Sequence, residues 1–304
     1  MHKNIISRLI DYLIIIFMVF MVIITVYPFY YAVINSLNDG NDLLRGYVLL
    51  WPRKFTFDSW KAVLADPTII RAMFITASRT IIVTVLSMFF TSMFAYAYSR
   101  PYLKGKRFYS VLGFINMYVN GGIIPFFLLI SSLGLYDTYW VYIIPSLFGG
   151  FYNVIIYTSN YKALPTSLFE SAKLDGASEF SIYARIVIPL SKPVLTALGV
   201  FSVVGIWNDY TVSLYYTQDT NLQTLQYYIL QLVKSRGAVE QLESSIAGNS
   251  AIAEMLKSAG GKGPVTVQTL ELAAMVLAAI PMVIIYPFAQ RFFAQGMMVG
   301  SVKE

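Results

Sequence analysis

The sequence lacks the side chains that most enzymes use for their chemistry. Its 304 residues include no cysteine and one histidine, His2. This composition excludes disulfides, thiolate metal sites, cysteine nucleophiles, histidine metal clusters and Ser-His-Asp catalysis. Charged residues are also scarce, at 12% against about 25% in a typical soluble domain. We therefore expect no catalytic residue, no metal site and no cofactor, and a membrane protein rather than a soluble enzyme.

The apolar residues, 57% of the chain, gather into six segments that are long enough to cross a membrane. A spanning helix needs about 20 residues, because about 30 Å of hydrocarbon is crossed at about 1.5 Å per residue. The segments run approximately from Leu9 to Asn35, Ile70 to Tyr98, Phe108 to Leu133, Tyr139 to Tyr161, Pro193 to Tyr216 and Leu270 to Phe293. The third is interrupted by Gly121, Gly122 and Pro125. The sequence thus predicts an all-α polytopic membrane protein with six transmembrane helices.

The basic residues predict the orientation of these helices. With the N-terminus inside, the inner segments hold twelve lysines and arginines in 65 positions, and the outer segments hold eight in 91. Inner loops of membrane proteins carry the excess of Lys and Arg. We therefore expect both termini in the cytoplasm. The net charge of +6 then reflects topology, and nucleic acid is not an expected partner.

The inner segment 163–193 predicts a helical hairpin. Ser167 and Glu170, three residues apart, are typical of a capping box that starts a helix. Asp175-Gly176 ends this helix, since glycine readily adopts the left-handed conformation found there, and a second helix starts near Ala177. Small residues at the tip let a partner approach closely, so the hairpin is a candidate docking element.

The spacing of Glu170-Ser171-Ala172, Gly176 and Ile186-Val187-Ile188-Pro189 resembles the signature of the membrane subunits of binding-protein-dependent ABC importers, which have the MetI-like fold. The departures are Ser171, where the family has Ala, and Ile188, where it has Leu. In that family the element is the coupling helix, which sits in a cleft of a separate ATPase subunit. The resemblance implies this coupling role for Glu170, Ser171, Ala172, Asp175, Gly176 and Ala177.

Other segments are similar to the carbohydrate-uptake permeases, in particular to the LplC-like polysaccharide or oligosaccharide type. They are AYAYSRPYLKGKRF at 95–108, NGGIIP at 120–125, LGLYDTYW at 133–140, WNDY at 207–210 and the tail at 290–304. The resemblance covers essentially the whole chain. It implies one transmembrane permease domain over 1–304, with a cytoplasmic coupling loop at 163–193 and an extracellular loop at 217–269.

The resemblance also implies the partners and the location. We expect a second homologous permease subunit, two ATPase subunits, an extracellular solute-binding protein and an oligosaccharide substrate, in the plasma membrane of a bacterium. The only Gly/Lys-rich stretch, GGKGP at 260–264, lacks the spacing of a phosphate-binding loop. ATP would therefore be hydrolysed by another chain.

Two charged residues fall inside predicted membrane helices, where charges are costly and are functional candidates. If helical, Asp209 lies about 24 Å above the inner face and Arg79 about 13 Å below the outer face, so they have comparable depth. We expect Asp209 to line the sugar path, with Arg79 either paired to it or facing the substrate. Alternatively, Arg79 extends outward to the interface and Asp209 is a structural hydrogen-bond anchor. The complete set of expected path residues is Trp207, Asn208, Asp209, Arg79, Asn120 and Asn153.

Two other functions remain possible from the sequence. One is a permease of the same fold for a peptide, an amino acid or a polyamine. The other is an ion-coupled secondary transporter, which would need membrane carboxylates and inverted repeats. Only Asp209 meets the first requirement, and no repeat is visible.

Overall fold

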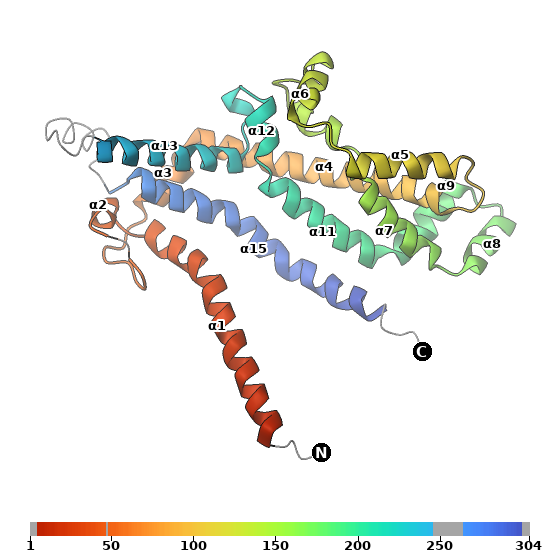
Figure 1. Cartoon of the computed structure of the whole chain (residues 1–304), viewed down its shortest axis with the longest axis horizontal. Helices are drawn as coiled ribbons and strands as arrows, with labels where there is room; N and C mark the ends of the chain where they lie inside the picture. The colour runs from red at the N-terminus through yellow and green to blue at the C-terminus, as the bar shows by residue number, and fades with distance from the viewer. Residues whose placement is uncertain (1–4, 47, 246–263, 300–304) are drawn as a thin grey trace. The chain divides into compact units, whose positions relative to one another are not determined.

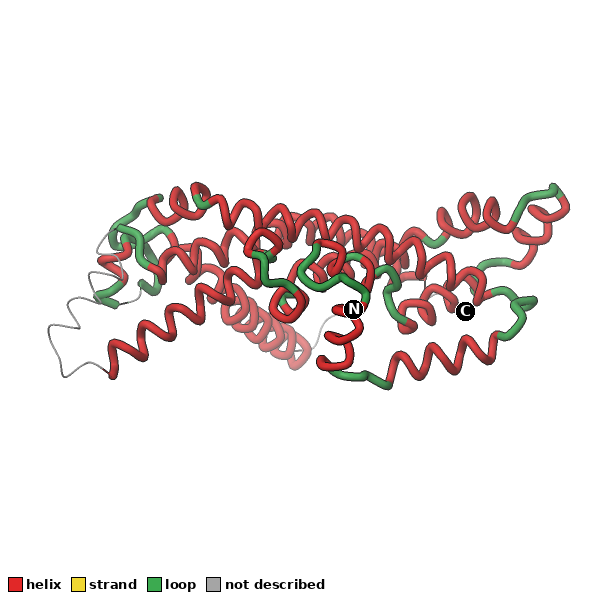
Figure 2. Tube along the Cα trace, turned by 90° about the horizontal axis from the view of Figure 1, so that it is seen from above, coloured by secondary structure: helices red, strands yellow, loops and turns green. Residues whose placement is uncertain are grey.

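The computed structural model describes residues 5–46, 48–245 and 264–299 (Figure 1). Over these ranges the chain consists of helices and loops, and the only strand-like pairing is an isolated antiparallel bridge between Asn38 and Phe55 (Figure 2). The described residues contain no group of three or more His, Cys, Asp or Glu side chains that could hold a metal ion. The predicted all-α class is confirmed.

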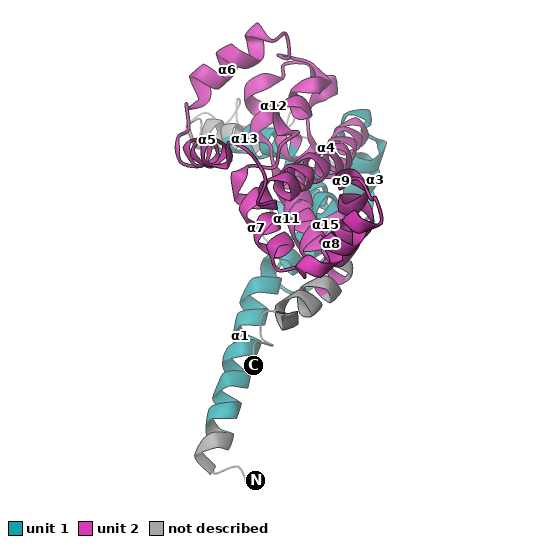
Figure 3. Ribbon diagram, turned by 90° about the vertical axis from the view of Figure 1, so that its right-hand side faces the viewer, with its two compact units in different colours: residues 1–69, 229–280 teal, residues 70–228, 281–304 magenta. Residues whose placement is uncertain are grey.

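The chain divides into two compact units, each built from segments that are distant in sequence (Figure 3). The first comprises residues 1–69 and 229–280, and the second comprises residues 70–228 and 281–304. The prediction of a single domain concerns the whole permease and stays a prediction.

In the first unit, α1 (Ile5–Ser36) is followed by the short helices α2 (Gly40–Leu43) and α3 (Asp58–Ala65). The most apolar stretch of α1 has a mean hydropathy of 2.6, and none of it is buried within this chain. Its C-terminal end is fixed by Asn35, which donates to the Val48 carbonyl (2.8 Å) and accepts from the Val48 amide (3.1 Å). The exposed apolar part of α1 therefore needs lipid or another protein around it.

In the second unit, α4 (Pro67–Ser99) is a continuous helix of 33 residues, whereas the segments after it are bent. The third predicted segment forms α5 (Lys106–Tyr118) and α6 (Ile123–Ser132), which meet at 115°. The fourth forms two 3₁₀ turns, η1 (Tyr139–Tyr142) and η2 (Ile144–Ser146), and then α7 (Phe151–Lys162), at 45°.

The hairpin segment and the fifth predicted segment follow. They form α8 (Thr166–Leu174), α9 (Glu179–Ile182), the π-helix η3 (Tyr183–Val187), α10 (Ile188–Leu190), α11 (Lys192–Asn208) and α12 (Thr211–Tyr216). The axis turns by 81° where α10 meets α11. The expected fifth span, from about Pro193 to Tyr216, is broken, because α11 ends at Asn208 and Asp209 has extended backbone dihedrals.

The remaining elements are the 3₁₀ turn η4 (Thr220–Leu222), α13 (Leu225–Ser245) and α15 (Val267–Val299). By length and composition, the described residues contain three helices that could cross a membrane, or up to six if each bent pair is one span. The count of six therefore stays a prediction. Of the GGKGP stretch, 260–263 lie outside the described residues.

Candidate functional site

The α8–α9 hairpin, residues 166–182, has a tip closed by backbone hydrogen bonds. Gly176 has φ = 78°, and the amides on either side bond back into α8, from Asp175 to Ser171 (3.0 Å) and from Ala177 to Ala172 (2.9 Å). This is the glycine-terminated helix end that the sequence predicts. The predicted capping box is wrong, since Pro165 occupies the N-cap position and no side-chain bond caps the helix.

The expected coupling residues divide into two groups on this hairpin. Glu170, Ser171, Asp175 and Gly176 are exposed. Ala172 and Ala177 are half-buried and pack against the hydrophobic core of the second unit. The exposed group thus forms a polar surface at the tip, and the two alanines fix that tip to the core.

A cluster around Glu179 joins the hairpin to the end of α4. Its carboxylate accepts hydrogen bonds from the hydroxyls of Tyr96 (2.5 Å) and Tyr102 (2.6 Å) and forms an ion pair with Lys173 (2.9 Å). Burial alone raises the pKa of Glu179, but these three donors outweigh it and hold the pKa at about 2. The carboxylate is therefore ionised at neutral pH.

A cation–π contact of the hairpin and a hydrogen bond of the residue directly after it give two further attachments. The buried ring of Phe169 lies under the Arg100 guanidinium, 4.0 Å from its centre. The Tyr183 hydroxyl, at the start of η3, lies 2.6 Å from the Ser92 hydroxyl on α4.

Arg79 and Asp209 form an ion pair at the break between α11 and α12. The Arg79 side chain is 2% exposed, and its Nη1 lies 3.3 Å from Asp209 Oδ2. Its Nη2 donates to the Ile206 carbonyl (2.6 Å) and to the Asp209 carbonyl, and its guanidinium lies 4.9 Å from the Tyr142 ring centre. The alternative in which Arg79 extends to the interface is wrong, because its charge satisfies the backbone carbonyls that the helix break frees.

The other expected path residues do not gather around this pair as one site. Trp207 is buried, whereas Asn208 is exposed and donates to the Val204 carbonyl (2.9 Å). Asn120 accepts from the Gly122 amide (2.9 Å), so it shapes the turn between α5 and α6. Asn153 on α7 lies instead in a polar cavity.

This polar cavity has a volume of about 400 Å³. Its polar side chains are Ser87 from α4, Ser146 from η2, Asn153 from α7 and Ser202 from α11, and no charged residue of the described chain lines it. A narrower extension also reaches Thr91. Asn153 donates to the Gly149 carbonyl (2.8 Å), and its amide oxygen makes no hydrogen bond within the described residues.

The α4 wall of this cavity, to which Ser87 and Thr91 contribute, was not predicted from the sequence. Hydroxyl residues recur along α4 at Thr76, Thr80, Thr84, Ser87 and Thr91. The intervals of four, four, three and four residues place them on one helix face. This periodicity is visible in the sequence and predicts a polar face on an otherwise apolar span.

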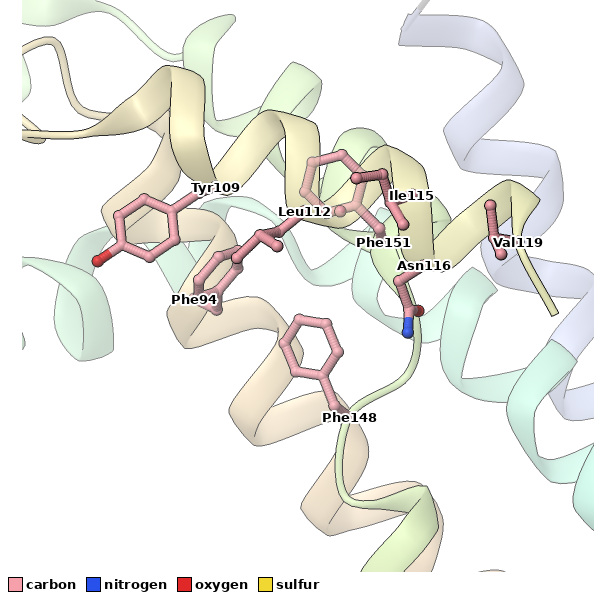
Figure 4. Close-up of a pocket in the computed structure, with 9 residues that line it drawn as sticks. Phe94, Tyr109, Leu112, Ile115, Asn116, Val119, Phe148 and Phe151 are labelled. Carbon is pink, nitrogen blue, oxygen red and sulfur yellow. The ribbon is translucent and has the colours of Figure 1, made fainter. Parts of the chain in front are cut away.

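A second cavity of about 570 Å³ shares Phe148 with the polar one. It is lined mainly by apolar and aromatic side chains from α4, α5 and the start of α7, together with the amide of Asn116 (Figure 4). Its floor is tightly packed, because a Cβ atom on Gly113 would lie 2.2 Å from the Phe151 ring.

Comparison with known proteins matches residues 1–299 to the family described as "Binding-protein-dependent transport system inner membrane component". Protein LplC of Bacillus subtilis (strain 168) is 35% identical over 303 residues, which cover 100% of this chain and 98% of that protein. The polygalacturonan/rhamnogalacturonan transport system permease protein YtcP of the same organism is 34% identical over 297 residues, which cover 98% and 99%.

Among solved structures, a chain of a bacterial ABC transporter involved in the import of the acidic polysaccharide alginate superimposes with a TM-score of 0.83. It is 25% identical, and the match covers 96% of this chain and 99% of that one. These likenesses confirm the permease fold and the family resemblance that the spaced hairpin motif predicted. The chain belongs to the family of binding-protein-dependent transport system inner membrane components.

Proposed function

We propose that this membrane protein forms half of the translocation path of an ATP-driven importer for oligosaccharides. The chain is a translocation subunit and not an enzyme. A second, homologous permease would complete the path, two ATPase subunits would hydrolyse ATP, and an extracellular binding protein would deliver the sugar. The observation that carries the proposal is the exposed hairpin tip around Gly176, together with the family match over residues 1–299.

The proposed orientation places both termini and the α8–α9 hairpin in the cytoplasm. The distribution of lysine and arginine supports it. Each ATPase subunit would receive a hairpin through Glu170, Ser171, Asp175 and Gly176, while Ala172 and Ala177 hold the tip on the core. ATP binding would then bias the transporter between inward-open and outward-open states, which is a shift between two populations.

An oligosaccharide substrate is supported by the relatives and by the polar cavity. YtcP is named for polygalacturonan and rhamnogalacturonan, and the structural relative for alginate. In this chain, Ser87, Asn153 and Ser202 offer hydroxyl and amide groups, which suit the hydroxyls of a sugar. Phe148 and Phe201 add aromatic faces to the same cavity.

The set of path residues that we propose from the structure is smaller than the set expected from the sequence. Asn153 and Asn208 are kept as path residues, since one lines the polar cavity and the other is exposed at the end of α11. Arg79 and Asp209 instead hold the helix break that shapes the path, and Trp207 is buried. Asn120 shapes the turn between α5 and α6.

Docking of the ATPase is tested by charge inversion at the tip. We expect Glu170→Lys to abolish co-purification of the ATPase with the tagged permease, because the inverted charge lies on the proposed contact surface. Asp58→Asn, which neutralises a half-buried carboxylate that is paired with Lys61 in α3 and accepts a hydrogen bond from Thr56, is the control. Retention of the ATPase by Glu170→Lys would refute the docking site.

The sugar path is tested by Asn153→Ala, with Asn160→Ala as control. Both asparagines lie on α7, but Asn160 lines neither part of the polar cavity. Loss of one hydrogen bond of about 1 kcal/mol corresponds to an increase of about fivefold in the KM for uptake. The KM should be measured with a neutral and with an acidic oligosaccharide. If Asn153→Ala and Asn160→Ala changed the KM equally for both sugars, Asn153 would not be a path residue.

A further inference from the structure

The α8–α9 hairpin is attached to α4 by side chains from four separate segments. Tyr96 belongs to the last turn of α4 and Tyr102 to the turn that follows it, while Lys173 ends α8 and Glu179 starts α9. The bonds of 2.5, 2.6 and 2.9 Å all end on the one carboxylate. Glu179 is thus the group through which the two helices of the hairpin, next to its tip, are joined to the end of α4.

Lys173 strengthens this joint by a second contact. Its ammonium also donates to the Tyr102 hydroxyl (3.3 Å) and lies 4.4 Å from the centre of the Tyr102 ring. The members of the cluster therefore contact one another as well as Glu179. A cluster of this kind holds a definite geometry better than one exposed ion pair, which by itself contributes little.

Helix α4 connects this cluster to the break between α11 and α12. Arg79 lies on the same helix as Tyr96, 17 residues earlier, which corresponds to about 25 Å along the axis. No proline follows Pro67 in α4, and the helix is continuous between the two positions. A displacement of the inner end of α4 therefore reaches the carbonyls of Ile206 and Asp209, which Arg79 holds.

We propose that Glu179 is a positioning residue that locks the α8–α9 hairpin to α4, so that the two move as one body and carry hairpin displacement to the Arg79–Asp209 break. The proposal rests on the proposed coupling function of the hairpin. The ionised state of Glu179 is consistent with it, because its lowered pKa keeps the negative charge in place.

Glu179→Gln is a suitable test variant because the fold does not depend on this carboxylate alone. The buried Phe169 ring and the contact between Tyr183 and Ser92 still attach the hairpin to the core. The amide keeps one acceptor oxygen and loses the charge and the second acceptor. We therefore expect an assembled transporter that still binds its ATPase.

The functional measurement is the amount of sugar imported per ATP hydrolysed by the complete transporter in proteoliposomes. We expect Glu179→Gln to lower this ratio by about fivefold or more, the lower end of typical coupling between sites. The ATPase rate itself persists, because docking is intact. Tyr102→Phe should lower the ratio too, and the double variant should be less impaired than the product of the two single effects, since both remove the same joint.

The physical measurement uses spin labels, which the absence of native cysteine makes specific. Ser167→Cys on α8 and Ala97→Cys on α4 are both exposed sites outside the cluster and outside the proposed docking surface. In the otherwise native transporter we expect a narrow distance distribution that does not change on ATP binding. In Glu179→Gln the distribution should broaden, whereas a merely fold-stabilising role would leave it narrow.

The outcomes separate this inference from the proposed function. If Glu170→Lys keeps the ATPase bound, the docking proposal fails whatever Glu179 does. If Glu170→Lys releases the ATPase but Glu179→Gln keeps the native import ratio and the narrow distribution, the docking proposal stands and the inference about Glu179 is overturned. Asp58→Asn is again the control and should leave both measurements unchanged.

Discussion

Substitution of Arg79 gives the strongest test of the role of the helix break. The guanidinium is 2% exposed and serves three acceptors, Asp209 Oδ2 and the carbonyls of Ile206 and Asp209. Arg79→Leu removes the guanidinium from all three, and among the described residues only the Ile206 carbonyl keeps another donor, the Asp209 amide (3.3 Å). An unpaired buried carbonyl costs about 1–3 kcal/mol, and breaking a buried ion pair costs about 3–5 kcal/mol. We therefore expect Arg79→Leu to destabilise the chain by about 3–5 kcal/mol.

Two further variants should destabilise the chain less than Arg79→Leu does. Arg79→Lys keeps the charge but loses the planar fork, so its cost should be intermediate, about 2 kcal/mol. Asp209→Asn keeps an acceptor oxygen for Arg79 and should cost about 1 kcal/mol. The control is Arg71→Leu on the same helix, because Arg71 is exposed and, among the described residues, its side chain bonds only to the side chain of Asn221. It should cost about 0.5 kcal/mol or less.

The assay is thermal unfolding of the detergent-solubilised transporter, followed by intrinsic fluorescence. A chain of this size loses about 2 °C of its unfolding midpoint per kcal/mol, so Arg79→Leu should lower the midpoint by about 6–10 °C. The order of destabilisation should be Arg79→Leu, Arg79→Lys, Asp209→Asn and Arg71→Leu. If Arg79→Leu were as stable as Arg71→Leu yet lost sugar uptake, Arg79 would contact substrate and would not hold the break.

Three shorter predictions concern packing, backbone strain and pH. Gly113→Ala should destabilise the chain by about 1–3 kcal/mol in the same assay, because the added methyl overlaps the buried Phe151 ring; an unchanged midpoint would contradict the close packing. Gly176→Val should weaken ATPase binding, measured by co-purification, since a left-handed residue with a side chain costs about 1–2 kcal/mol; full retention would contradict the role of the glycine. The pKa of Glu179 is lowered from 4.5 to about 2, so the stability it contributes is present above pH 4.5 and is lost as the pH falls toward 2. The spin-label distribution should therefore stay narrow down to pH 4.5 and broaden progressively as the pH falls toward 2, and broadening above pH 4.5 would refute the assignment.

Much of the helical architecture follows from the sequence because apolar runs and their boundaries are local signals. The hairpin is an example, since Asp175-Gly176 predicts the helix end that the structure places there. The pairing of Arg79 with Asp209 was one of the alternatives derived from predicted depth, and the structure contains it.

Other features depend on contacts between segments that are distant along the chain. The end of α11 at Asn208 is not marked by glycine or proline, and its freed carbonyls are satisfied by Arg79, 127 residues away from Ile206. The joint at Glu179 likewise needs hydroxyls from Tyr96 and Tyr102, 83 and 77 residues away. Neither contact can be predicted from the local spacing of residues. The hydroxyl face of α4, in contrast, can be predicted from that spacing.

We expect this chain to translocate sugar only as part of an assembly that hydrolyses ATP on the side of the α8–α9 hairpin. The most direct measurement is uptake of a labelled oligosaccharide into proteoliposomes that contain the complex isolated through a tag on this chain. We expect uptake that requires both ATP on the side of the α8–α9 hairpin and the binding protein on the opposite side. Uptake by the chain alone, or uptake by the complex that continues without ATP, would contradict it.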